Sequence, residues 1–139
     1  MEYLIGAALA LTVAMSATLI GFDRQRVFYP TLMIVIASYY ALFAVVGESG
    51  LALELATMLG FVAVTILAFK TTLWWIVVAL IAHGLFDVVH PLLINDPGVP
   101  RWWPGFCLTY DVVAGAYLTG LLISGRVTST PEAGVSVRG

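Results

Sequence analysis

Both histidines of the chain lie in one short apolar segment, between positions 83 and 91. His83, Asp87 and His90 follow the spacing i, i+4, i+7, and Pro91 comes directly after them. On an α-helix this spacing places the three side chains on one face. Imidazole and carboxylate groups bind metal ions or transfer protons, so the pattern predicts a site with one of these two chemistries.

Two more carboxylates, Glu54 and Asp111, lie in the apolar segments before and after this one. With a rise of about 1.5 Å per residue, both lie about 6–9 Å below the same end of their helices. His90 lies at about 6 Å and Asp87 at about 10 Å, and His83 lies deeper, at about 16 Å. Ionisable groups at such depth in a membrane usually face the interior of a helix bundle and pair with one another. We therefore predict one polar site formed by these five residues.

The composition indicates which elements must position these residues. The chain has 139 residues, of which 61% are hydrophobic and 10% charged, and its mean hydropathy is +1.02. A soluble domain is typically about 45–50% apolar and about 25% charged. The sequence therefore predicts an integral membrane protein. A net charge of −2 without a basic stretch argues against nucleic acid as a partner.

Segments of roughly 20 apolar residues are long enough to span a bilayer as helices. We predict an all-α fold, a single transmembrane domain over residues 1–125, followed by a flexible cytoplasmic tail at 126–139. The five predicted helices cover about residues 3–22, 27–46, 51–69, 73–94 and 105–124.

The distribution of Lys and Arg predicts the orientation of the bundle. Arg101 is the one basic residue expected on one side, and the others are expected on the opposite side: Arg24, Arg26, Lys70, Arg126 and Arg138. Because basic residues are enriched in cytoplasmic loops, we predict that the N-terminus is outside and the C-terminus inside. The polar site then lies in the outer half of a cell inner membrane, with membrane lipids as partners.

One hypothesis for the site is a divalent metal, zinc or iron. His83, Asp87 and His90 would supply two nitrogen ligands and one oxygen ligand, and Glu54 or Asp111 would complete the shell. Catalytic zinc takes three protein ligands and a water, and two histidines with one carboxylate suit non-haem iron.

A second hypothesis is metal-free acid–base catalysis on a lipophilic small molecule. Here His83, Asp87, Glu54 and Asp111 would be the catalytic residues, with one group kept protonated as an acid while another serves as base. Isomerisation, hydration or cyclisation of an isoprenoid or sterol-like molecule would fit this chemistry. Aromatic residues would line the pocket: Tyr39, Tyr40, Trp103 and Tyr110.

Two further interpretations remain open. A chain of Asp, Glu and His can relay protons or hold a cation, although the inner half of the bundle lacks ionisable residues. A homo-oligomer could supply such groups. Alternatively, the polar cluster only holds helices together, as small-residue stripes such as Gly6, Ala10 and Ala14 do in lipid.

The segment His83–His90, together with residues 95–104 (NDPGVPRWWP), resembles a family of small bacterial multi-pass membrane proteins without an assigned activity. That resemblance extends over about a third of the chain and implies the fold class. The pair His83 and Asp87 is also similar to the His-x-x-x-Glu pair of the emopamil-binding and sigma-2-receptor superfamily of sterol isomerases. This chain has Asp in place of Glu, and the pair lies on the fourth predicted helix. That likeness implies acid–base chemistry on a sterol-like molecule.

Overall fold

The computed structural model describes residues 1–131, so Arg138 and most of the predicted tail lie outside the described part of the chain. Within this range each of five helices is long and apolar enough to cross a membrane, which confirms the prediction of an all-α, multi-pass membrane protein. The helices are α1 (Glu2–Ile20), α2 (Phe28–Gly47), α3 (Leu51–Lys70), α4 (Trp74–Leu93) and α5 (Trp103–Ile123), with a short 3₁₀ helix, η1 (Phe22–Arg24), after α1. Each lies within two residues of its predicted range.

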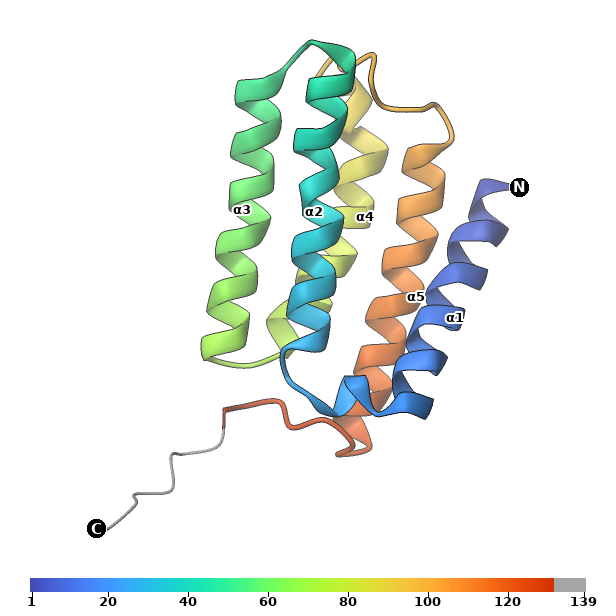
Figure 1. The fold of residues 1–139 in the computed structure, drawn as a ribbon, viewed down its shortest axis with the longest axis vertical. Coiled ribbons are helices and arrows are strands. Elements are labelled where there is room, and N and C mark those ends of the chain that lie inside the picture. The colour runs from blue at the N-terminus through green and yellow to red at the C-terminus, as the bar shows by residue number, and fades with distance from the viewer. Residues whose placement is uncertain (132–139) are drawn as a thin grey trace.

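The helices stand side by side along the long axis of the molecule (Figure 1). In order of contact, α1 packs on α5, α5 on α4, α4 on α3 and α3 on α2, and α2 also contacts α4. The N-terminus and the loops α2–α3 and α4–α5 lie at one end, called here the upper end (Figure 1). The links α1–α2 and α3–α4 and the segment after α5 lie at the lower end.

The outer surface of the bundle is apolar and the interior differs between its two halves. Leu19 and Leu92, for example, are 85% and 84% exposed, as expected for side chains that contact lipid tails. In the lower half, Ile76 and Leu80 of α4 are fully buried, as is Leu73, which directly precedes this helix. In its upper half the same face carries the predicted polar residues, so the polar site is confined to one end of the bundle.

The α4–α5 loop is in close backbone contact with the end of α2. The backbone N–H of Gly98 donates to Asp96 Oδ1 at 2.8 Å, which closes the turn after α4. A Cβ atom on Gly98 would overlap the carbonyl oxygen of Phe43, and one on Gly47 would overlap Asp96 Oδ1. Glycine at both positions thus lets the α4–α5 loop pack on the end of α2, above the polar site.

The first residues assigned to the flexible tail pack on the lower end. Val127 is buried, and the backbone N–H of Leu73 donates to the carbonyl oxygen of Ser129 at 2.8 Å. Val127 and Ser129 therefore hold the start of this segment against the bundle.

Helix α1 packs through small residues, and this packing predicts a change in stability. A Cβ on Gly6 would overlap the Phe106 carbonyl oxygen and Thr109 Oγ1 of α5. We expect Gly6→Ala to lower the free energy of unfolding by about 1–3 kcal/mol, because the α5 backbone would have to move. Unfolding in detergent micelles, followed by circular dichroism, measures this change.

Gly60 provides the matched control, since it also lies in a helix, but a Cβ atom added to it would have no neighbour within 4 Å among the described residues. Gly60→Ala should be neutral or stabilising by up to about 1 kcal/mol, because alanine is the better helix former. Equal effects of the two substitutions would contradict close packing of α1 on α5.

Candidate functional site

The first pair of the site joins α4 to α5. His83 Nδ1 lies 2.8 Å from Asp111 Oδ2, and both side chains are buried, with Asp111 0% exposed. The two helices approach closely here because Gly84 faces α5: its Cβ would be 3.1 Å from Leu108 Cα and 3.2 Å from Asp111 Cβ. Any larger residue at position 84 would push the two partners apart.

The second pair joins α4 to α3. His90 Nε2 lies 2.7 Å from Glu54 Oε1, and both residues are buried. Glu54 stands in the first turn of α3 and His90 in the last turn of α4. Since these two turns lie at the same end of the bundle, the two side chains meet near the upper end.

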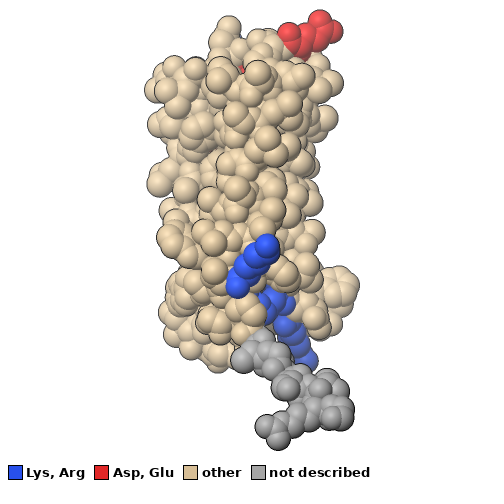
Figure 2. Space-filling view, turned by 90° about the vertical axis from the view of Figure 1, so that its left-hand side faces the viewer, with Lys and Arg blue, Asp and Glu red and all other residues tan. Residues whose placement is uncertain are grey.

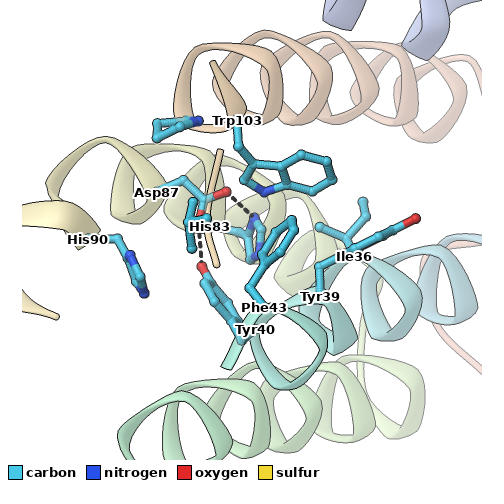
Figure 3. Close-up of a pocket in the computed structure, with 10 residues that line it drawn as sticks. Ile36, Tyr39, Tyr40, Phe43, His83, Asp87, His90 and Trp103 are labelled. Atoms are coloured by element: carbon cyan, nitrogen blue, oxygen red, sulfur yellow. Dashed lines mark hydrogen bonds and ion pairs between the residues drawn. The ribbon is translucent and has the colours of Figure 1, made fainter. Parts of the chain in front are cut away.

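Asp87 lies between the two pairs and is held by a residue of α2. The hydroxyl of Tyr40 donates to Asp87 Oδ1 at 2.6 Å, and Asp87 Oδ2 is 3.8 Å from His83 Nδ1. The Tyr40 ring also packs against both imidazoles, with ring centroids 5.2 Å from His83 and 5.6 Å from His90. Figure 3 shows Tyr40 and His83 on either side of the Asp87 carboxylate.

All five predicted site residues are thus brought into one buried cluster by α3, α4 and α5, and Tyr40 of α2 is a sixth member. Sequence reasoning assigned Tyr40 only to the lining of a pocket. Tyr40 follows Met33, Ile36 and Ala37 at helical spacing, and all four are buried. This spacing could have indicated that Tyr40 lies on the inward face of α2.

Several polar atoms of the cluster have no hydrogen-bond partner among the described residues. These atoms are His83 Nε2, Asp87 Oδ2, Asp111 Oδ1 and Glu54 Oε2. Most buried polar groups in proteins are hydrogen-bonded, and each unmet one costs about 1–3 kcal/mol. The cluster therefore retains the capacity to bind water or the polar group of a ligand.

The donor groups of the cluster face different partners and do not converge on one point. Within residues 1–131, no group of three or more His, Cys, Asp or Glu side chains is arranged to hold a metal ion. His83 and His90 turn to carboxylates on different helices, α5 and α3. The predicted set of His83, Asp87 and His90 therefore does not fit zinc or iron in this arrangement.

A small cavity lies directly beside the cluster. It has a volume of about 10 Å³ and is lined by His83, Asp87 and His90 together with apolar and aromatic side chains, among them Trp103 (Figure 3). Room for one water requires about 10–15 Å³, so this space is suited to a single water between the two histidines.

A larger cavity of about 240 Å³ lies between α1, α2 and α5. Its walls are mainly apolar and aromatic, and Asp111 is the only carboxylate among the described residues that line it. Because Leu9 and Val35 in its wall are also exposed on the lipid-facing surface, at 44% and 50%, the cavity is reached from the side of the bundle. Ile36, Tyr39 and Trp103 line both this cavity and the small one, so they form the partition between them.

A third cavity of about 260 Å³ lies under the α4–α5 loop at the upper end. Its lining includes Asn95, Asp96 and Arg101, and it shares His90 with the small cavity. His90 therefore stands between the polar upper end and the buried cluster.

Comparison of the chain with protein-family models, curated proteins and solved structures gave no match.

Proposed function

We propose that the protein is a membrane-embedded enzyme that moves a proton on a small lipophilic molecule, with Asp111 and His83 as the acid–base pair. The observation that carries this proposal is the cavity of about 240 Å³, whose one carboxylate among the described lining residues, Asp111, is bonded to His83 at 2.8 Å. Apolar walls with a few polar groups are typical of small-molecule sites. The volume lies just below the usual range of about 300–1,000 Å³, which favours a compact substrate.

Asp111 and His83 together can move a proton between two atoms of a substrate. Asp111 Oδ1 is fully buried behind the cavity wall and has no partner among the described residues. It would accept a proton from one atom of the substrate once side chains of that wall move aside. The same proton then returns from Asp111 to a different atom, so that a double bond of the substrate changes position and no other reagent is consumed. His83 orients the Asp111 carboxylate through Oδ2, as the partner of a catalytic base commonly does.

Protons of the site would exchange with solvent through the small cavity and the cavity under the α4–α5 loop. His90 borders the cavity at the polar upper end as well as the small cavity beside His83 and Asp87. One water in the small cavity would connect the two imidazoles. Protons held on Asp111 and His83 would then exchange with bulk water, although the substrate enters from lipid.

We propose that the upper end faces outward, with the bundle in a cell inner membrane. In support, the lower end carries four basic residues (Arg24, Arg26, Lys70 and Arg126) and the upper end carries Arg101. Basic residues are enriched on the cytoplasmic side. The substrate would then enter from the outer leaflet.

Transport of protons or cations has less support from the packing. Below His83, the inward face of α4 continues as Leu80 and Ile76, and Leu73 precedes the helix; each of the three is 0% exposed. A pathway through the bundle would need water or polar groups at this depth. A polar site closed on one side favours binding and chemistry over conduction.

Solvent deuterium provides a test that does not require the substrate to be known in advance. Purified protein is incubated in D₂O with an apolar lipid extract of the host membrane, and the extract is analysed by mass spectrometry. We expect one component to gain deuterium, and we expect Leu9→Trp, which fills the cavity, to slow the gain by about 10²-fold, since small displacements from productive geometry cost about this much.

Leu19→Trp is the control, because Leu19 lies on the same helix, is 85% exposed and does not line the cavity. The Leu19→Trp variant should transfer deuterium to the same lipid component at the wild-type rate. Absence of labelling by folded wild-type protein, or equal labelling by both tryptophan variants, would contradict the proposed function.

A further inference from the structure

The lower end of the bundle carries a second concentration of charge, separate from the polar site. Four basic residues lie there: Arg24, Arg26, Lys70 and Arg126. Among the described residues, Asp23 is the carboxylate at this end, and it is buried and accepts a hydrogen bond from Thr18. Figure 2 shows the basic atoms gathered at the lower end, below a broad uncharged surface.

Three of these cations line one cavity. This cavity is an open surface groove that lies between the α1–α2 link, the end of α3 and the segment after α5. Arg24, Arg26 and Lys70 come from different parts of the chain to reach it, and its described lining contains no Asp or Glu. Within residues 1–131 none of the three forms a salt bridge, so their charge is available to an anion.

Arg26 is held in place before any ligand binds. Its guanidinium donates to the carbonyl oxygen of Thr128 at 2.9 Å and to that of Phe69 at 3.0 Å. Phe69 lies in the last turn of α3, where free carbonyl groups attract cations. Partial burial lowers the pKa of the Arg26 guanidinium, but arginine stays charged at neutral pH. A fixed cation loses little side-chain entropy on binding.

The position along the bundle indicates the source of the anion. Lys70 is the last residue of α3, and the exposed Trp74 and Trp75 begin α4 just beyond it. Tryptophan at the ends of spanning helices marks the level of the lipid headgroups. The cavity therefore lies where phosphate groups of the bilayer lie.

From this convergence we infer a binding site for the phosphate-bearing headgroup of an anionic membrane lipid, formed by Arg24, Arg26 and Lys70. Arginine and lysine bind phosphate oxygens through charge-assisted hydrogen bonds. The site lies at the opposite end of the bundle from Asp111, so it stands independently of the proposed enzymatic function.

The test is titration of the detergent-solubilised full chain, followed by native mass spectrometry. The probes are dioctanoyl phosphatidic acid, dioctanoyl phosphatidylcholine and inorganic phosphate. We expect phosphatidic acid to bind, and the variant Arg24→Gln/Lys70→Gln to bind it about 30-fold more weakly, from about 1 kcal/mol per basic residue. Arg26 is left unchanged because its loss would release the Phe69 and Thr128 carbonyl groups.

Arg101→Gln is the matched control, since it removes one cation at the upper end. It should bind phosphatidic acid as the wild type does. Binding of inorganic phosphate with the same dependence on Arg24 and Lys70 would support the phosphate site and assign it to a soluble phosphate. Equal binding of phosphatidylcholine, or no loss in the double variant while it remains folded, would overturn the inference.

Discussion

Asp111→Asn is expected to reduce deuterium transfer from solvent to the substrate by about 10²–10⁴-fold, the usual contribution of a general acid or base. Asparagine has the shape of aspartate, and its oxygen can still accept a hydrogen bond from His83, which lies 2.8 Å from Asp111 Oδ2. The bundle should therefore fold as before, because the change removes the capacity to gain and lose a proton rather than a contact. The measurement is the rate at which the responsive component of the lipid extract gains deuterium in D₂O.

Asp23→Asn is the control for this substitution. Asp23 is also a buried aspartate, but it lies at the lower end and accepts its hydrogen bond from Thr18. It should label the component at the wild-type rate. Labelling by Asp111→Asn at more than about a tenth of the wild-type rate would contradict the assignment of the acid–base role, given the expected range.

The second large effect concerns stability and the pair of Glu54 and His90. We expect Glu54→Leu and His90→Leu, each alone, to lower the free energy of unfolding by about 3–5 kcal/mol, because each leaves a buried polar partner without its hydrogen bond. Both side chains are buried and bonded at 2.7 Å. The double substitution should recover most of the loss, since two apolar side chains can replace a buried pair at little cost.

Unfolding in mixed detergent micelles measures the three variants, and the interaction energy of the cycle gives the coupling between the two residues. Glu2→Leu serves as the control, because Glu2 lies in the first turn of α1 and is only partly buried. It should change stability by less than about 0.5 kcal/mol. Additive effects of the two single substitutions would show that the pair is not coupled.

The sequence by itself determined the five spanning helices of the protein. Runs of about 20 apolar residues form helices in a bilayer, because a helix satisfies every backbone hydrogen bond within its own segment. The helical period also determined that His83, Asp87 and His90 share one face of α4, which the structure places inside the bundle. Depth followed from the rise per residue, so Glu54 and Asp111 were correctly expected at the same end of the bundle.

The tertiary structure alone decided which partner each polar residue has. A helical period defines the face of a helix but not the neighbour that the face meets, and here α5 supplies Asp111 to His83 while α3 supplies Glu54 to His90. The role of Tyr40 depended on α2 contacting α4, a pairing between helices that are not consecutive. The cavity beside Asp111 likewise exists only because α1 packs against α5 and next to α2. Spacing along one chain segment determines local geometry, whereas a site shared by four helices is determined by how those helices pack.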